Sequence, residues 1–426
     1  MKVVYPVCCG IDVHKSFLIA TVITTKAGEL MPHYQKKRFS TFNNQILALK
    51  DWLLECKCHD VCMESTGKYW VPVSNLLEDA INITIANPKW VRAVKGNKDD
   101  KKDSKWIAEL FRMGLVKGSF IPTKDIRVLR EFTRYRTRLV SHRSSEKNRL
   151  QNAFTVGNVA MDSVVSDMFG VSSKKVRDYL ISTKEFDPNH VLTLLHGRMK
   201  PKGQELIESI EGYHFTNEQI LRIQMIEEHK VHLDHSIDFL NSLLDQMVEP
   251  YEPAIQLLET IPGISRQSAV QIISEIGTDM SQFSTSKRLC CWAGLSPSSN
   301  ESAGKKKSVR ISRAGVYLKP ALVQCAHAAK KAKEENPYYR LKYERIAKRR
   351  GKKRAIIAIA RMMLTAIYHM LSTGEVWNPT DLYKIDMPDN LVQKQKDKVV
   401  KQATKLLISV GILPDDFVRK DRTDST

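Results

Sequence analysis

The first 115 residues alternate between short apolar runs and amphipathic repeats. The runs at Val7–Val13 and Phe17–Thr24 are rich in apolar side chains, which is typical of buried strands, and residues 34–41 form a weaker third run. Residues 46–54 repeat apolar side chains at helical spacing and predict an amphipathic helix. The elements that follow are predicted as a strand at 61–64, a helix at 70–80, a strand at 81–86 and a helix at 101–114.

This succession of elements predicts an α/β fold for the N-terminal part. Three strands, a helix, a strand, a helix, a strand and a helix is the order of a ribonuclease-H-like domain. In that topology the first and fourth strands lie side by side. Asp12 on the first strand and Glu64 at the end of the fourth are therefore expected to be neighbours.

The rest of the chain is predicted to be mainly helical, beginning with a long basic helix at residues 124–155. Arginines recur along it at spacings of three, four and four residues, which places them in one stripe. The stripe consists of Arg127, Arg130, Arg134 and Arg138. Because the surrounding charges are nearly all positive, we interpret it as a phosphate-binding surface, with a solvated charged face as the alternative.

A second long helix is predicted from Thr216, which forms a capping box with Gln219, to about residue 248. Its apolar residues alternate at spacings of three and four and form a heptad seam that contains Lys230. Such a seam predicts either a coiled coil between subunits or a helix that packs on its own domain. Residues 156–215, which precede it, are predicted as helices and loops without candidate chemistry.

The C-terminal part contains a candidate helix-hairpin-helix element. Two helices, predicted at 253–259 and 266–276, are joined by Ile261-Pro262-Gly263-Ile264. Gly263 would let the backbone turn, so that N–H groups at the start of the second helix meet a phosphate. A plain helical corner would use the same residues. Further helices are predicted at 314–333 and 355–371.

A polar segment of small residues, 294–312, precedes the helix at 314–333 and ends in a cluster of cations. A serine among flexible small residues near Lys305 and Arg310 is suited to meet a phosphate, although a disordered surface loop would have the same composition. A second basic cluster lies at 348–354. The candidate nucleic-acid-binding residues of the C-terminal part are Gly263, Lys305, Lys306, Lys307, Arg310, Arg349 and Arg350.

Composition restricts the class of protein. The 426 residues suggest two or three domains, and 67 lysines and arginines against 47 acids give a net charge of +20. This surplus favours a polyanionic partner, foremost nucleic acid, over a merely basic protein. Because no apolar run reaches ~18 residues and no signal peptide is recognisable, we expect a cytoplasmic protein without a membrane span.

The cysteines predict free thiols rather than disulfides or a metal site. Eight cysteines in a chain of this length do not form a disulfide framework. One short segment contains four potential zinc ligands, Cys56, Cys58, His59 and Cys62. A closed site would need all four side chains to turn inward from one short segment, and no second CxxC half exists, so buried thiols are the preferred interpretation.

Four acidic residues form the candidate chemistry. Asp12 and Glu64 belong to strands, and Asp100 and Asp103, three residues apart, share one face at the start of a helix. Hard carboxylate oxygens suit Mg²⁺, and two such ions can clamp the attacking and leaving oxygens of a phosphoryl transfer. An acidic pocket in a basic chain therefore predicts phosphoryl transfer on nucleic acid.

Together these motifs resemble the DEDD transposases of the insertion-sequence-110 class, relatives of the Piv-type invertases. The resemblance extends over about residues 7–375, with the motifs in the family's order. It departs from the family at Asp99, where Thr is usual, and at Ser104, where Ala is usual. The matching motifs are Asp12-Val13-His14-Lys15, Met63-Glu64-Ser65-Thr66-Gly67, Lys98-x-Asp100-x-x-Asp103, Ile261-Pro262-Gly263-Ile264, Gly294-Leu295-x-Pro297, and Ser302-x-Gly304 followed by Ile311-Ser312-Arg313-x-Gly315.

The resemblance implies a RuvC-like DEDD catalytic domain at residues 1–122 and a basic helix with a helical or coiled-coil region at 123–250. A mainly helical transposase domain at 251–380 and a polar tail at 381–426 would follow. By position, Mg²⁺ would be bound by Asp12, Glu64, Asp100 and Asp103, and the nucleophile would be Ser302, with Ser298, Ser299 and Ser308 as rivals.

The resemblance also implies partners. These are DNA, a bridge RNA and further copies of the chain, as a dimer to tetramer in a prokaryotic, nucleoid-associated setting. One active centre would combine the acidic site and the serine of different subunits. We therefore expect an RNA-guided DNA recombinase; a metal-only RuvC-like nuclease, in which water attacks, and a non-catalytic nucleic-acid-binding protein are the alternatives.

Overall fold

The computed structural model divides into two compact units, Met1–Pro122 and Thr123–Thr426. It describes residues 3–25, 31–65, 67–88, 100–183, 185–297, 300–302, 305–308, 310–331 and 337–379, with residues 393, 397, 400 and 404. Several predicted features lie outside the described residues: most of the tail from 381, Asp99, Ser298 and Ser299, and the side chains of Asp100, Ser302, Lys305, Lys306, Lys307 and Ser308.

The first unit is built on a five-stranded mixed sheet with the order β3-β2-β1-β4-β5. The strands are β1 (Val7–Val13), β2 (Phe17–Thr24), β3 (His33–Ser40), β4 (Asp60–Glu64) and β5 (Asn82–Ala86). The first three strands pair antiparallel, whereas β4 pairs parallel with both β1 and β5. The predicted α/β class and the predicted contact between the first and fourth strands are thus confirmed.

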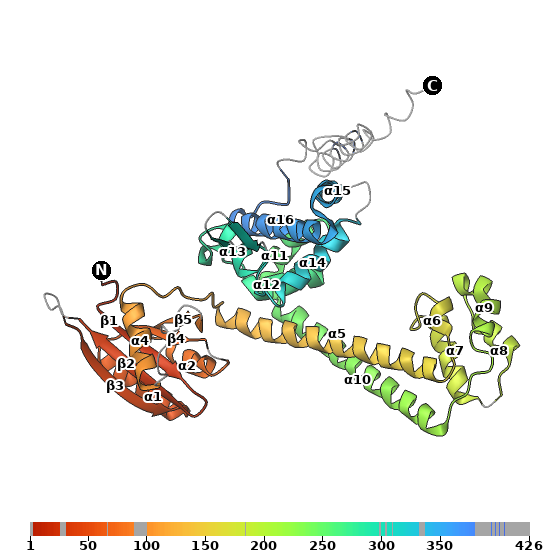
Figure 1. Ribbon diagram of the computed structural model, residues 1–426, viewed down its shortest axis with the longest axis horizontal. Helices are drawn as coiled ribbons and strands as arrows, with labels where there is room; N and C mark the ends of the chain where they lie inside the picture. The colour runs from red at the N-terminus through yellow and green to blue at the C-terminus, as the bar shows by residue number, and fades with distance from the viewer. Residues whose placement is uncertain are drawn as a thin grey trace. The chain divides into compact units, whose positions relative to one another are not determined.

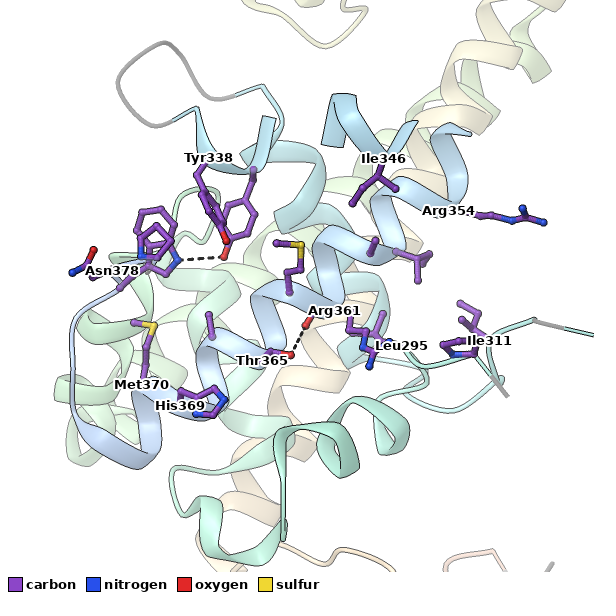
Figure 2. Close-up of a pocket in the computed structure, with 18 of the residues that line it drawn as sticks. Leu295, Ile311, Tyr338, Ile346, Arg354, Arg361, Thr365, His369, Met370 and Asn378 are labelled. Atoms are coloured by element: carbon purple, nitrogen blue, oxygen red, sulfur yellow. Dashed lines mark hydrogen bonds between the residues drawn. The ribbon is translucent and has the colours of Figure 1, made fainter. Parts of the chain in front are cut away.

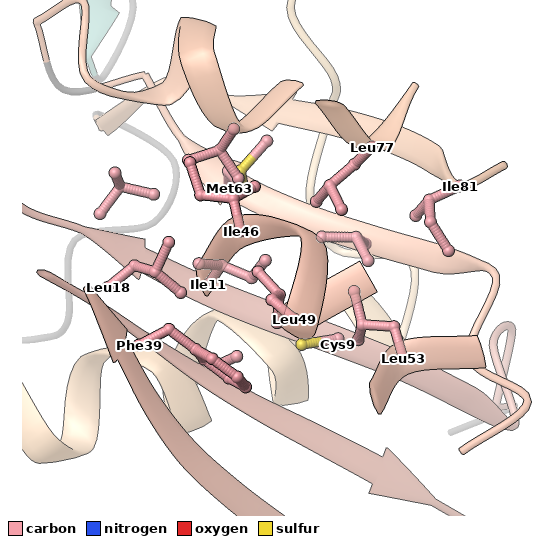
Figure 3. Close-up of a cluster of buried hydrophobic side chains, with 14 of the residues drawn as sticks. Cys9, Ile11, Leu18, Phe39, Ile46, Leu49, Leu53, Met63, Leu77 and Ile81 are labelled. Carbon is pink, nitrogen blue, oxygen red and sulfur yellow. The ribbon is translucent and has the colours of Figure 1, made fainter. Parts of the chain in front are cut away.

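Helices cover both faces of this sheet. Because successive side chains of a strand point to opposite faces, Cys9, Ile11 and Val13 of β1 pack with α1 (Asn43–Glu55) and α2 (Trp70–Leu77). Figure 3 shows this core, with Ile11 lying near Leu49 of α1. The other face of β1 meets α4 (Asp100–Arg112), whose Ile107, Ala108 and Phe111 pack with Cys8 of β1.

The second unit begins with two long antiparallel helices, α5 (Lys124–Val156) and α10 (Asn217–Met247) (Figure 1). Leu233, Ile237 and Leu240 of α10 are buried against Leu139 of α5. The heptad seam therefore packs within its own chain, against apolar residues of α5. The pattern of the seam alone did not indicate which helix it would pack against. The seam accordingly gives no support to the predicted coiled coil between subunits.

A small helical cluster is inserted between α5 and α10. Its core includes the adjoining ends of α5 and α10, and Phe154 at the end of α5 packs there with Val176, Leu180 and Leu206. Its two ends meet, since the amide of His214 donates to the carbonyl of Gly157 at 3.2 Å. The cluster consists of α6 (Met161–Val164), α7 (Val171–Ser182), α8 (Pro188–Thr193), η1 (Gly197–Lys202) and α9 (Gly203–Glu208).

The C-terminal elements are η2 (Glu249–Tyr251), α11 (Glu252–Glu259), α12 (Arg266–Ile276), η3 (Met280–Gln282), α13 (Ser286–Trp292), β6 (Asn300–Ser302), β7 (Lys305–Ser308), α14 (Leu318–Ala329), α15 (Tyr338–Arg350) and α16 (Lys352–Thr373). Among them, α16 packs against α11, α13, α14 and α15 (Figure 1). By length and composition alone α16 could cross a membrane, but this packing is that of a core helix.

Candidate active site

Two of the predicted acids lie side by side on the face of the sheet that α4 covers. The parallel register pairs Gly10 with Cys62 and Ile11 with Met63, so the next position on each strand holds Asp12 and Glu64. Residues in register on neighbouring strands point to the same face. The sheet topology thus places the two carboxylates together, as the strand order predicted.

The helix that carries Asp103 is held close to β1 by a glycine. A Cβ on Gly10 would lie 2.9 Å from the Cα of Ala108 and closer still to the backbone N of Ala108 and the backbone O of Ser104. Only a residue without a side chain allows this approach. Asp103, in the first turn of α4, is half-buried beside the end of β1. Asp100 is the first residue of this helix.

A buried pair of hydroxyls connects α4 to the sheet. Thr21 Oγ1 of β2 and Ser104 Oγ of α4 lie 2.8 Å apart, and both side chains are buried. Each hydroxyl satisfies the other in a place that water does not reach. Sequence reasoning did not find this pair or the role of Gly10, although a glycine and a lone threonine inside apolar strands were visible signals.

Asp12 sits where negative charge is unfavourable. Burial raises the pKa of its carboxyl, His14 lowers it, and the charges of Asp103 and Glu64 raise it further. His14 Nε2 lies 3.0 Å from Asp12 Oδ2, and the His14 ring stacks on Phe17 at 4.4 Å between centroids. A bound cation would relieve the mutual repulsion of these carboxylates.

The donor set fits Mg²⁺ by chemistry, because all the candidate ligands are carboxylates. Within the part of the chain that the structure describes, no three His, Cys, Asp or Glu side chains converge closely enough to hold a metal ion. The candidate zinc ligands Cys56, Cys58, His59 and Cys62 likewise form no such group. Burial raises the pKa of Cys58 and of Cys62 to about 12, and all eight cysteines are free thiols, as the sequence predicted.

Ser302 lies on a hairpin rather than in an irregular loop. β6 and β7 pair antiparallel, with Ser302 opposite Lys305. Pro297 and Ile311 form a bridge below the hairpin. The sequence did not predict these strands because their residues are small, polar and cationic and show no apolar alternation.

The base of this hairpin is closed by two glycines. Gly294 and Gly315 both have φ of +67°, and each lies directly against the backbone of the opposite segment. A Cβ on Gly294 would lie 2.5 Å from the carbonyl oxygen of Ala314, and one on Gly315 would clash with the carbonyl oxygen of Ala293. The turn at Gly315 also explains why α14 begins at Leu318, later than predicted. The hairpin is thus anchored at a fixed point of the helical unit.

The arginine stripe of α5 largely faces the protein rather than solvent. Arg130 donates to the carbonyl oxygen of Ser274 at 3.1 Å and to that of Glu275 at 2.5 Å, at the C-terminal end of α12. Burial lowers the pKa of Arg130 to about 10, whereas the charge of Glu275 raises it. Such a cation satisfies the last carbonyls of α12 and complements its dipole.

Arg134 makes a two-pronged ion pair with the buried carboxylate of Glu275, at 2.7 and 2.8 Å. Its guanidinium also lies over the ring of Tyr317, and Arg138 donates to the hydroxyl of Tyr317 at 3.3 Å. The guanidinium groups of Arg130 and Arg134 thus hold α12 and the segment after the hairpin, and phosphate binding by this stripe stays a prediction. Arg127 is half-buried and Arg138 is exposed.

Gly263 also has a structural role. It adopts φ of +91°, and a Cβ would lie 2.6 Å from the backbone N of Ala329 and from the carbonyl oxygen of Cys325. The turn between α11 and α12 therefore packs directly on α14. Close packing explains the glycine without a phosphate, as the alternative of a helical corner allowed.

Comparison with known proteins supports the motifs. A family model described as "Transposase", for DEDD transposases of the IS110 class, matches residues 9–156. A second, described as "Transposase IS116/IS110/IS902 family", matches residues 255–344. The chain is also similar to a "Transposase for insertion sequence element IS1111A" from Coxiella burnetii (strain RSA 493 / Nine Mile phase I). The two are 23% identical over 325 residues, which cover 74% of this chain and 79% of that protein.

Proposed function

We propose that this chain, which belongs to the IS110 class of insertion-sequence transposases, cuts and rejoins DNA with two chemical centres. One is the acidic cluster of a RuvC-like domain, and the other is Ser302 on the β6–β7 hairpin. The observation that carries the proposal is the placement of Asp12 and Glu64 on adjacent parallel strands, under the helix that begins with Asp100 and contains Asp103.

The acidic centre would bind Mg²⁺ through Asp12, Glu64, Asp100 and Asp103. A bound Mg²⁺ would withdraw negative charge from the scissile phosphate. The protein's own part is to hold the carboxylates together against their repulsion. The close contact at Gly10 and the Thr21–Ser104 hydrogen bond hold α4 against the sheet, and His14 orients the carboxylate of Asp12.

The serine centre would supply the nucleophile. The Ser302 oxygen attacks phosphorus, a serine–phosphate bond forms, and the bond from phosphorus to the 3′-oxygen breaks, so that a 3′-hydroxyl is released. A 3′-hydroxyl then attacks the serine–phosphate, which rejoins the strand and returns the serine. The covalent intermediate conserves the energy of the phosphodiester bond, which exchange of strands requires. Lys305 pairs with Ser302 in the strand register, and its positive charge would favour a phosphate bound at this position.

A bridge RNA would choose the DNA sites, and the net charge of +20 is consistent with a protein that binds both nucleic acids. We also propose that the active assembly is a homo-oligomer in which one subunit supplies the acidic cluster and another the serine. Support for both points comes from membership of the family and from the charge.

A denaturing gel with labelled DNA tests the two centres. Wild type with Mg²⁺ and RNA should form a covalent protein–DNA adduct. Ser302→Ala should bind DNA and RNA but form no adduct, whereas Ser308→Ala, a change of the same kind in the paired strand, should form it. Asp12→Asn and Glu64→Gln should also prevent the adduct while binding persists, because the basic surface carries the affinity.

Three results would each contradict part of the proposal. DNA that is cut by wild type without any adduct would show that water attacks, as in the metal-only nuclease. Full adduct formation by Asp12→Asn would show that the acidic cluster is not the metal centre. An adduct that persists in Ser302→Ala and is lost in Ser308→Ala would move the nucleophile within the hairpin.

A further inference from the structure

The C-terminal unit contains a groove of about 1260 Å³ along one face of α16 (Figure 2). One face of this helix is buried among its neighbours, and the opposite face is a stripe of half-exposed residues at helical spacing. Ile357, Ala358, Met362 and Ala366 give that stripe an apolar floor. Because no described segment covers this apolar stripe, the groove has space to bind another molecule or segment.

The chemistry of the groove changes along its length. Its lining contains five cations, Arg310, Arg350, Lys353, Arg354 and Arg361, and one carboxylate, Glu375. The cations lie at the N-terminal half of α16 and on neighbouring segments. The other end is aromatic, where the indole of Trp377 donates to the hydroxyl of Tyr339 at 3.3 Å and its ring lies 5.7 Å from that of Tyr338.

The groove adjoins the base of the hairpin that carries Ser302. Leu295, Pro297, Arg310 and Ile311 line it, and the Pro297–Ile311 bridge closes that base. Leu295 and Arg361 of α16 both line the groove and are labelled in Figure 2. Whatever fills the groove therefore lies next to the segment that positions the proposed nucleophile.

We propose that this groove binds an unpaired stretch of the DNA strand at the cleavage site, with phosphates on the cations and bases on the apolar floor. The inference rests on the proposed function. A basic groove with apolar and aromatic surfaces is the arrangement by which proteins hold single strands. A duplex would present its backbone and grooves but no base faces to the floor. The volume also exceeds the roughly 300–1,000 Å³ of small-molecule pockets, which favours a polymer.

Charge argues against the basic stretch 391–410 of the protein's own distal segment as the occupant. The chain leaves the groove at Pro379, and this stretch carries five lysines and one acid, Asp397. It would repel a groove with five cations and one acid. A polyanion has the complementary charge.

Neighbouring lysines at the start of α16 provide a matched test. Lys353 lines the groove, whereas Lys352 is equally exposed but does not line it. Fluorescence anisotropy of the full chain with a labelled single-stranded DNA of about ten nucleotides measures binding against salt. Lys353→Glu should weaken binding and lower the log–log salt slope by about 0.7, the value for one phosphate contact on a single strand. Lys352→Glu should leave that slope close to wild type.

A second measurement tests the bases. Wild type should bind an abasic strand of the same length at least about five-fold more weakly, since stacked bases contribute that much or more. Met362→Gln, which keeps the side-chain length but makes the floor polar, should reduce this difference. Equal salt slopes in Lys353→Glu and Lys352→Glu, or an abasic strand bound as tightly as the normal one, would overturn the inference.

Controls separate the occupants and the two proposals. Stronger competition by duplex DNA or by single-stranded RNA than by single-stranded DNA would contradict the assignment. So would a fall in molecular mass in Met362→Gln without loss of DNA binding, because a second copy would then fill the groove. If wild type forms no adduct but the groove variants lose binding of single-stranded DNA, the proposed function is contradicted and the proposed role of the groove is supported. If the groove variants bind single-stranded DNA as wild type does while wild type forms the adduct, the role of the groove is contradicted and the proposed function is supported.

Discussion

Gly10→Ala should damage both the stability and the activity of the N-terminal unit. The new methyl group would lie 2.9 Å from the Cα of Ala108 and closer to two further backbone atoms of α4, whereas ordinary contact begins at 3.4 Å. None of these atoms belongs to a flexible side chain. Because packed interiors do not yield locally, α4 has to move away from β1 by about 1 Å.

The energetic cost follows from what that movement breaks. Overpacking of a tight contact costs about 1–3 kcal/mol. The movement also separates the buried hydroxyls of Thr21 and Ser104, now 2.8 Å apart. A buried hydroxyl without a partner costs about 1–3 kcal/mol, so a total of about 2–6 kcal/mol is expected. Asp103 moves with the helix, and a displacement of about 1 Å in a catalytic group lowers rates by roughly a hundred-fold.

Urea unfolding and Mg²⁺-dependent adduct formation measure the two effects. Gly118→Ala is the matched control, since its methyl group would meet only the side-chain methyl of Thr84, at 3.3 Å, which a small shift relieves. We expect the control to stay within about 1 kcal/mol of wild type, because this contact is slight and involves no backbone atom. If Gly10→Ala unfolds and reacts like Gly118→Ala, α4 does not pack on β1 in the way described here.

Three further predictions concern buried polar groups. Ser104→Ala should destabilise by about 1–3 kcal/mol in urea unfolding, whereas the double change with Thr21→Val should recover most of this, because no unsatisfied hydroxyl remains; an additive pair of effects would contradict the hydrogen bond. Arg134→Glu should cost about 3–5 kcal/mol by removing the close partner of the buried Glu275, placing a second negative charge beside it and leaving only the ion pair of 3.8 Å with Arg130, whereas the exposed Arg138→Glu should cost little; equal losses of stability would refute the structural role. Mg²⁺ should raise the melting temperature of wild type but not of Asp12→Asn, whose metal-free form should be at least as stable as wild type because burial penalises the carboxylate; an equal rise in both would exclude Asp12 as a ligand.

Local patterns in the sequence predicted most of the helices and strands. β1, β2 and α12 have the bounds that their apolar patterns predicted, because each buries a continuous face. The capping box at Thr216 is present as predicted and starts α10. β3 was the weakest prediction, and its side chains are exposed over most of its length, so no apolar alternation marked it.

Contacts between distant residues were not predictable in this way. The sequence predicted a phosphate-binding stripe at Arg130 and Arg134. Their partner Glu275 lies 141 residues beyond Arg134, so no pattern near the arginines indicated this contact. Ser104 was noticed only as a departure from a family pattern, and its partner Thr21 lies 83 residues away. For the candidate site, the sequence indicated which acids share a sheet edge, whereas the glycine and hydroxyl contacts that hold them became visible only in three dimensions.

The helical cluster between α5 and α10 has the properties of an exchangeable module. The amide of His214 donates to the carbonyl of Gly157, so the chain leaves the long helices and returns to them at nearly one point, and the core of the cluster includes the adjoining ends of α5 and α10. A segment whose ends meet can be lengthened, shortened or replaced without altering the frame that carries it. Changes within residues 158–213 that keep the packing on Phe154 can therefore accumulate without disturbing the contacts of α5 with Glu275 and Tyr317.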